Sequence, residues 1–119
     1  MSDDPDHIAD LFAAFGPVSV RRMFGGAGIY ADGKMFALIY DGLVYLKADE
    51  RTAARFEREG CSQFTYTSSN GRHTLMSYWR LPERLYDDPG ELAQWARHAL
   101  MVAQSAGKRT GRRTRRARP

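Results

Sequence analysis

The chain has little of what a disulfide-bonded, metal-binding or membrane protein needs. Its 119 residues include one cysteine, Cys61, which excludes an intrachain disulfide. The three histidines (His7, His73 and His98) share no close spacing and form no recognisable zinc-binding set. No apolar run approaches the length of a membrane span, and the acidic N-terminus has no signal-peptide core. We therefore expect a cytoplasmic protein with no metal, no cofactor and no membrane contact.

The residue groupings that mark an active site are also missing. Cys61 follows a predicted helix C-terminus, whereas reactive cysteines favour helix N-termini or nearby cations, so we interpret it as a small buried hydrophobic residue. The pairs Asp3-Asp4 and Asp87-Asp88 are typical of helix starts, where acids are stabilised by the helix dipole. Because no activated nucleophile, catalytic carboxylate pair or metal set is recognisable, we predict that the protein is not an enzyme.

One glycine motif suggests nucleotide binding at first sight. Residues 26–31 (Gly-Ala-Gly-Ile-Tyr-Ala) fit the G-x-G-x-x-G/A fingerprint of dinucleotide-binding proteins. That fingerprint has to open a helix, whose N-terminus holds the pyrophosphate. Here a strand and an Asp-Gly turn follow instead. Glycines that permit a bulge or a close approach to the sheet explain the run better.

The charge of the chain is unevenly distributed along the sequence. Its net charge is +4, but residues 107–119 hold seven of the 18 basic residues and none of the 14 acidic ones, which leaves residues 1–106 with 11 basic against 14 acidic. The basic residues of this segment are Lys108, Arg109, Arg112, Arg113, Arg115, Arg116 and Arg118. We predict one folded domain over residues 1–106 and a disordered basic tail over 107–119. Such a tail attracts nucleic-acid phosphates without reading bases; the alternative is a solubilising extension.

Two Asp-Gly turns define the clearest local structure. Asp32-Gly33 and Asp41-Gly42 each separate apolar runs, which is the signal of a hairpin with a type I′ turn. They predict three consecutive strands: one ending at residue 31, one over 34–40 and one over 43–47. Side chains alternate between the two faces of such a sheet.

Both faces of this predicted meander are apolar. The first face would carry Met35, Ala37, Ile39, Val44 and Leu46, with Gly26, Gly28 and Tyr30. The second would carry Phe36, Leu38, Tyr40, Leu43 and Tyr45, with Met23, Gly25, Ala27 and Ile29. Because a sheet that is apolar on both faces needs cover on both, we expect Phe36, Leu38, Tyr40, Leu43 and Tyr45 to form an interface with a protein partner or a second copy. The alternative is that the chain's own loops and third helix shield this face.

The remaining elements follow from capping and periodicity. Asp4-Pro5 begins a first helix that Gly16-Pro17 ends, and Asp49 begins a second that ends at Gly60. Asn70-Gly71 predicts a hairpin turn, and the third helix begins at Asp88 with a stripe formed by Leu92, Trp95, Ala96, Ala99, Leu100 and Ala103. The predicted order is α-β-β-β-α-β-β-α, an α+β fold with a largely antiparallel sheet.

This order and four of its segments resemble a known family. The segments are residues 22–30, 35–39, 43–47 and 78–83. The motif residues are Arg22, Met23, Phe24, Gly25, Gly26 and Gly28 in the first segment, and Trp79 and Pro82 in the last. Over roughly residues 5–105 the chain resembles the N-terminal domain of the TfoX/Sxy competence regulators. The resemblance implies a fold like that of secretion chaperones, which often pair into dimers. It also implies a role in bacterial gene regulation, in which members promote DNA-uptake genes with the cyclic-AMP receptor protein. Full-length regulators of that family carry a second, C-terminal domain, whereas only the basic tail follows here.

Two functional interpretations remain. The first is a non-enzymatic regulatory or adaptor domain that acts through protein contacts in bacterial transcription or competence regulation. The second is a small nucleic-acid-binding accessory protein that uses its arginine-rich tail.

Overall fold

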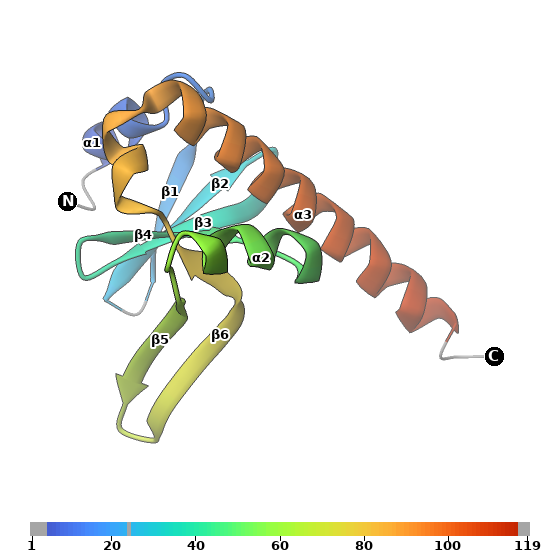
Figure 1. Cartoon of the computed structure of the whole chain (residues 1–119). Helices are drawn as coiled ribbons and strands as arrows, with labels where there is room; N and C mark the ends of the chain where they lie inside the picture. Colours follow the sequence, from blue (N-terminus) through green and yellow to red (C-terminus); the bar gives the residue numbers. More distant parts are fainter. Residues whose placement is uncertain (1–4, 24, 117–119) are drawn as a thin grey trace.

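Three helices lie on one side of an antiparallel sheet (Figure 1). The computed structural model describes residues 5–23 and 25–116, and within these ranges the side chains except at 23, 68, 75, 76 and 106–116. The elements are α1 (Pro5–Leu11), β1 (Ser19–Met23), β2 (Gly26–Ala31), β3 (Lys34–Tyr40), β4 (Leu43–Lys47), α2 (Glu50–Arg58), β5 (Gln63–Ser68), β6 (Gly71–Arg80), the 3-10 helix η1 (Glu83–Asp87) and α3 (Pro89–Arg116). The α+β class and the antiparallel sheet are confirmed.

The strand order is β1-β2-β3-β4-β6-β5, and each neighbouring pair is antiparallel. Four strands precede α2, one more than the sequence predicts. The additional strand arises because residues 19–31, which read as one run, form two paired strands on either side of Gly25. Gly25 has a φ of +81°, a left-handed conformation that glycine adopts without steric cost.

The two predicted Asp-Gly turns are confirmed. Asp32 and Gly33 have φ values of +52° and +75°, and Asp41 and Gly42 have +52° and +77°, as a type I′ turn requires. The second turn sets Ile39 opposite Val44. The predicted faces of β3 and β4 therefore hold from residue 37 onward.

A β-bulge near the first turn overturns the predicted faces of β2. Tyr30 pairs with Met35, but Ile29 pairs with Ala37, so Phe36 is an extra residue in β3. Because one inserted residue exchanges the two faces of the partner strand, Ala27 and Ile29 lie on the helical side and Gly26 and Gly28 on the opposite side. The prediction that Gly26 and Gly28 share a face with Ala37 and Ile39 is therefore wrong.

The main core lies between the sheet and the helices. Phe36 is fully buried there, with its ring centroid 5.5 Å from that of Phe12 and 5.0 Å from that of Phe15. Phe36 is therefore not part of the partner interface that the sequence predicts. Phe56 of α2 packs edge-on against Trp95 of α3 at 5.0 Å. The predicted α3 stripe is confirmed: Leu92, Trp95, Ala96, Ala99 and Ala103 are buried and Leu100 packs against them.

The caps of the second and third helices also match the sequence. The Asp49 carboxylate accepts from the backbone N–H groups of Arg51 and Thr52, each at 3.0 Å, and Gly60 has a φ of +78°. These hydrogen bonds, that of Thr52 first, hold the pKa of Asp49 below its usual range. At α3 the Asp88 carboxylate accepts from the N–H of Glu91 at 3.1 Å.

Helix α3 continues past the predicted domain boundary. It runs to Arg116, so residues 107–116, which the sequence predicts to be a disordered tail, are helical. Lysine and arginine have high helix propensity, and no proline occurs in this segment before Pro119. Residues 117–119 lie outside the described part of the chain.

Gly26 generates a stability prediction. A Cβ atom at this position would lie 2.1 Å from the carbonyl oxygen of Ile39, which is backbone and cannot rotate away. Gly26→Ala should lower the free energy of unfolding by about 1–3 kcal/mol, the usual cost of overpacking, as measured by urea denaturation. The control is Gly90→Ala, where the nearest atom is 3.9 Å away, and it should be neutral or slightly stabilising. Equal stabilities for the two variants would contradict this packing.

Candidate functional site

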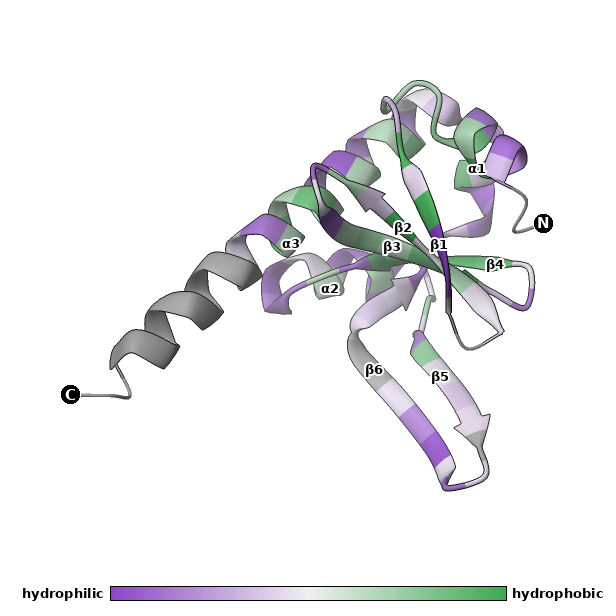
Figure 2. Ribbon diagram, turned by 180° about the vertical axis from the view of Figure 1, so that it is seen from behind, coloured by the Kyte–Doolittle hydropathy of each residue, from purple (hydrophilic) through white to green (hydrophobic). Residues whose placement is uncertain are grey.

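The sheet face turned away from the helices is the candidate site, and it is in front in Figure 2. The strand pairings place Arg21, Gly28, Leu38, Tyr45 and Arg80 in one row that crosses five strands. We call this surface the open face. Its side chains are Arg21, Tyr30, Met35, Leu38, Tyr40, Leu43, Tyr45, Lys47, Tyr78 and Arg80, with Phe64, Tyr66 and His73 added by the last hairpin.

The centre of the open face is covered by the chain itself. Leu38, Phe64 and Tyr78 form a second, small core and are 1%, 0% and 7% exposed. The ring of Phe64 lies 5.3 Å from that of Tyr40 and 4.8 Å from that of Tyr45. The cover comes from the β5–β6 hairpin. It does not come from α3, which packs on the other side.

This cover reduces the interface that the sequence predicts. Leu38 is buried within the chain and Phe36 belongs to the main core. Tyr40, Leu43 and Tyr45 remain half-buried and accessible. These three residues are the part of the predicted interface that a partner can still contact.

The hairpin reaches this position through a sharp irregularity. Gln63 pairs with Trp79, but the next residue, Phe64, pairs with Leu75. β6 therefore bends between these pairs, and the hairpin projects from the sheet in Figure 1. Along the hairpin Tyr66 stacks on Phe64 at 5.6 Å and His73 stacks on Tyr66 at 5.0 Å.

Cations on the open face lie over its aromatic rings. The Arg21 guanidinium is 5.0 Å from the ring centroid of Tyr30, and the Lys47 ammonium is 4.9 Å from that of Tyr78. Burial lowers the pKa of Lys47. Burial also raises the pKa of Tyr45, and Asp41 adds to this rise while Arg80 opposes it.

An apolar pocket adjoins the open face at the β3–β4 turn. Its volume is about 300 Å³, and it is lined by Gly42, Leu43, Arg80, Leu81, Glu83 and Tyr86. The Tyr86 hydroxyl accepts a hydrogen bond from the backbone N–H of Val44 at 3.0 Å, which fixes one wall. We call this cavity the Leu43 pocket. Sequence reasoning missed it because its walls come from β4 and η1, which are distant in sequence.

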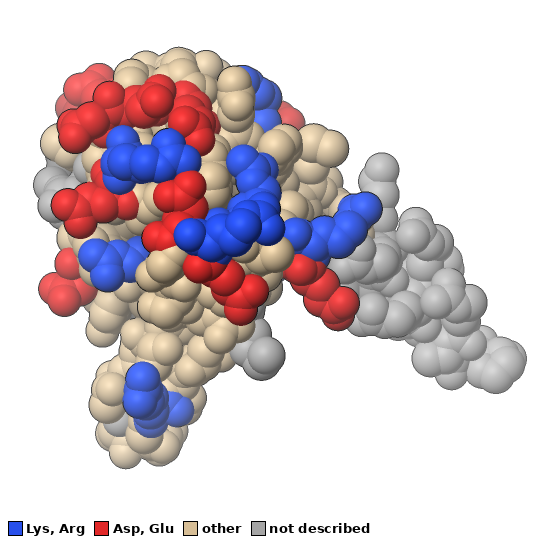
Figure 3. All heavy atoms as spheres, in the orientation of Figure 1, with Lys and Arg blue, Asp and Glu red and all other residues tan. Residues whose placement is uncertain are grey.

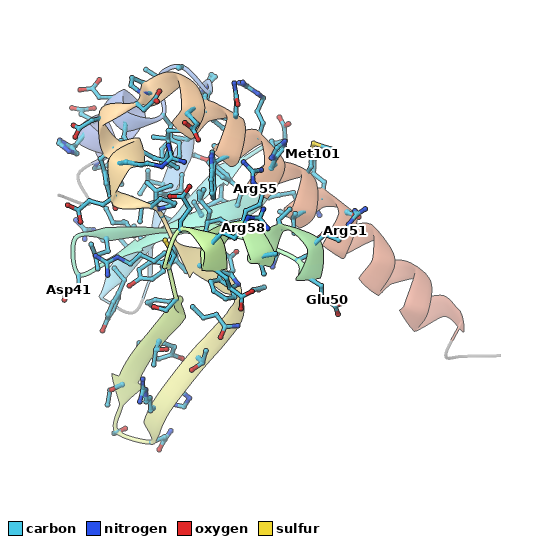
Figure 4. All side chains as sticks on the ribbon, in the orientation of Figure 1. Asp41, Glu50, Arg51, Arg55, Arg58 and Met101 are labelled. Atoms are coloured by element: carbon cyan, nitrogen blue, oxygen red, sulfur yellow. The ribbon has the colours of Figure 1, made fainter. Side chains whose placement is uncertain are left out.

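The helical side carries charges that mainly serve the fold. Figure 4 shows Arg51, Arg55 and Arg58 along α2, and Figure 3 shows acidic and basic side chains intermixed on this side. Arg55 lies 4.3 Å from the Trp95 ring centroid, and its Nη1 is 2.7 Å from His98 Nδ1.

Arg84 of η1 connects α2 to α3. Its guanidinium forms ion pairs with Glu59 at 2.6 Å and with Glu91 at 2.9 Å. These hydrogen bonds hold the pKa of both carboxyls below the usual range. The network joins three elements of the helical side.

The residues of the family motifs are spread over the fold and do not come together in one site. Trp79 is 9% exposed within the main core, and Pro82 is buried. Arg22 is exposed in β1. The glycines of the motif lie at the β1–β2 turn and within β2 at Gly25, Gly26 and Gly28, so no helix follows them and the nucleotide fingerprint is not formed. Phe24 and the side chain of Met23 lie outside the described residues.

Cys61 and the possible metal ligands are the remaining candidate residues. Cys61 is half-buried, and burial, with Glu59 as a smaller cause, raises the pKa of its thiol, which disfavours the reactive thiolate. Within residues 5–23 and 25–116, no three His, Cys, Asp or Glu side chains are grouped to hold a metal ion. Across the same residues, no helix is long and apolar enough to cross a membrane.

The basic residues of the tail are placed only in part. Lys108, Arg109, Arg112, Arg113, Arg115 and Arg116 occupy the last turns of α3. Their side chains, and all of Arg118, lie outside the described part of the chain.

Comparison with known proteins identifies the family. The family model of the TfoX N-terminal domain matches residues 10–103. The chain is 30% identical over 98 residues to the DNA transformation protein TfoX1 of Aliivibrio fischeri, covering 79% of this chain and 46% of that protein. It is 28% identical over 94 residues to Protein Sxy of Escherichia coli, covering 79% of this chain and 44% of that protein. The chain belongs to the TfoX/Sxy family, a family of competence regulators, and spans less than half the length of these relatives.

Tyr78 allows the small core of the open face to be tested by pH. Burial, with a smaller effect of Tyr30, raises the pKa of Tyr78 to about 12, and its hydroxyl donates to the carbonyl oxygen of Met35 at 3.2 Å. Because the folded state favours the protonated phenol, its contribution to stability is complete below pH of about 10, the ordinary tyrosine pKa, and is lost as the pH rises toward about 12.

Tyr78→Phe should lower the free energy of unfolding at neutral pH by about 1 kcal/mol, the net value of one hydrogen bond. Denaturation at a series of alkaline pH values should show a shallower loss of stability for the variant than for the parent. If the stability curves of the variant and the parent ran parallel with pH, the pKa of Tyr78 would not be raised in the folded state.

Proposed function

We propose that this chain is a non-enzymatic, cytoplasmic regulatory domain that acts through protein contacts in bacterial transcription or competence regulation. Membership of the TfoX/Sxy family supports the regulatory role. The observation that carries the contact mechanism is the Leu43 pocket, an apolar cavity of about 300 Å³ on the surface beside two half-buried tyrosines.

The pocket has the chemistry of a protein-contact site. Leu43 and Leu81 provide apolar walls, and Tyr86 is held in place by its hydrogen bond to Val44. Arg80 and Glu83 supply charge at the same cavity. Interfaces commonly place an anchoring side chain of one partner in such a pocket, with polar groups around it.

Two occupants suit this site within the proposed function. One is a transcription regulator, and the family resemblance makes the cyclic-AMP receptor protein the first to test. The other is a second copy of the chain, in a dimer of the secretion-chaperone kind. Both place Tyr40, Leu43 and Tyr45 in the interface.

Leu43→Ser tests both occupants. Loss of the anchoring wall should weaken association with the cyclic-AMP receptor protein, or self-association, by at least about fivefold, since a central interface residue contributes more than about 1 kcal/mol. Biolayer interferometry measures the first association and sedimentation velocity the second.

The matched control is Met101→Ser. Met101 is a large apolar residue, 63% exposed on α3, on the helical side of the molecule (Figure 4). Its replacement should leave both associations within about twofold, below the size of a central-residue effect. Equal behaviour of Leu43→Ser, Met101→Ser and the parent in both assays would overturn the proposed interface.

A second candidate function is nucleic-acid binding through the basic segment of residues 107–119. The observation that favours it is the seven cations of this segment, with no acid among them. Such a segment binds phosphates by counterion release and without sequence preference. In this function the folded domain positions the segment at the end of α3.

Replacement of the seven basic residues of the tail by glutamine tests this function. Duplex DNA binding should weaken, and the plot of log affinity against log salt should become shallower by about 0.9 for each phosphate that is no longer neutralised. Fluorescence anisotropy across a salt titration measures both. A control with the order of residues 107–119 shuffled keeps the charge and should bind like the parent. If the slope of log affinity against log salt were unchanged in the glutamine variant, the tail would not be the part of the chain that contacts DNA phosphates.

A further inference from the structure

The acidic residues of the described chain are absent from its strands, whereas basic residues occur in both strands and helices. The six strands contain six basic residues (Arg21, Arg22, Lys34, Lys47, Arg72 and Arg80) and no aspartate or glutamate. All acidic residues of the described chain lie in helices, caps and turns. The strand pairings place Arg21, Lys47 and Arg80 on the side of the sheet away from the helices, whereas Arg22, which pairs with Ala27, lies on the helical side.

Three of these cations stand on the open face at defined positions. Arg21 and Arg80 occupy the two ends of the row that crosses five strands. Lys47 is on the same side, two residues beyond Tyr45 in β4. Arg21 and Arg80 are exposed, and none of the three forms an ion pair with an acid among the described residues. An anionic ligand can therefore contact all three without displacing a carboxylate.

Aromatic rings lie on the same face and continue along the last hairpin. Tyr40 and Tyr45 flank Phe64, and Tyr66 and His73 continue the series along the hairpin with centroid separations of 5.6 Å and 5.0 Å. Tyr40, Tyr45, Tyr66 and His73 are half-buried, so each ring keeps accessible area. Planar rings interleaved with cations are the chemistry of single-stranded nucleic-acid recognition, in which bases stack on rings and phosphates contact the cations.

We propose that the open face binds single-stranded nucleic acid. Arg21, Lys47 and Arg80 contact the phosphates, and Tyr40, Tyr45, Tyr66 and His73 receive the bases. The site belongs to the folded domain and is separate from the basic tail. It shares Tyr40, Tyr45 and Arg80 with the proposed protein contact, and Arg21, Tyr66 and His73, which do not line the Leu43 pocket, distinguish the two. Recognition is not sequence-specific, because every base has a face that can stack.

The test uses the full chain with the seven basic tail residues replaced by glutamine, so that the tail does not mask the sheet. The probe is a labelled oligothymidylate of about 16 nucleotides, the upper site size of a small single-strand-binding fold. Fluorescence anisotropy should show binding that persists in this background. Adding Arg21→Gln, Lys47→Gln and Arg80→Gln should weaken it at least tenfold, and should make the salt dependence shallower by about 0.7 for each phosphate that is no longer neutralised.

The matched control removes three arginines from the helical side. Arg51, Arg58 and Arg97 are exposed, and their replacement by glutamine changes the net charge by the same amount. This control should leave the affinity within about twofold, since it removes no stacking or phosphate contact. Circular dichroism and thermal melting establish that both triple variants are folded. If the two triple variants lost the same affinity, net charge alone would explain the loss, and the proposed site would be overturned.

Tyr66→Leu separates stacking from charge. It keeps an apolar side chain but removes the ring, and should weaken oligothymidylate binding at least about fivefold, the low end of the value of one stacked base. The Met101→Ser variant, on the helical side, should bind the oligonucleotide like its parent. Unchanged affinity in Tyr66→Leu would overturn the stacking arrangement.

Two competitors distinguish the class of anion. Duplex DNA should compete weakly, because its bases are not available to the rings. Poly-glutamate, which has charge but no bases, should also compete weakly. Equal competition by poly-glutamate would identify the open face as a site for acidic protein segments, and equal competition by duplex DNA would identify a general phosphate surface; either result overturns the proposal, as does the absence of any binding.

Discussion

The structure depends on the extra residue that the bulge at Phe36 adds to β3. Because side chains alternate along a strand, this one residue decides which side chains of β2 face the helices. With the bulge, Ala27 and Ile29 complete the main core and the glycines of β2 turn to the opposite side. Phe36 itself packs against Phe12 and Phe15 and holds the N-terminal segment on the sheet. Without the bulge, the helices would meet glycine where the core now has Ile29.

The two faces of the sheet are closed by different means. On one side α3 and α2 bring Trp95 and Phe56 to a large core, as amphipathic helices commonly do. On the other, a bend in β6 swings Phe64 over Leu38, so that a hairpin of the same sheet covers part of it. This cover is incomplete, and it leaves accessible rings and a pocket in a domain whose helical side is occupied by its own ion pairs.

The sequence predicts the parts of this fold that are encoded locally. The Asp-Gly turns need positive φ at both positions, and Asp49 and Asp88 cap helices through hydrogen bonds to residues two or three positions ahead, so all four are readable within a few residues. The faces of β2 and the bend beyond Gln63 are not predictable in this way, because each depends on contacts with segments elsewhere in the chain, such as Phe12 and Phe15 against Phe36 and Leu38 under Phe64. The same holds for the candidate site. The sequence indicates an aromatic face. Whether Leu38 or Tyr45 is accessible, however, depends on the position of Phe64 in the folded chain.

The absence of acids from the strands makes the local field differ from what the net charge suggests. A protein with a small net charge can still have a directional field near a surface where charges of one sign gather. Arg21, Lys47 and Arg80 make the open face such a surface. A polyanion is attracted to it during approach, before any contact forms. This attraction weakens over a distance of about 10 Å at an ionic strength of about 0.1 M.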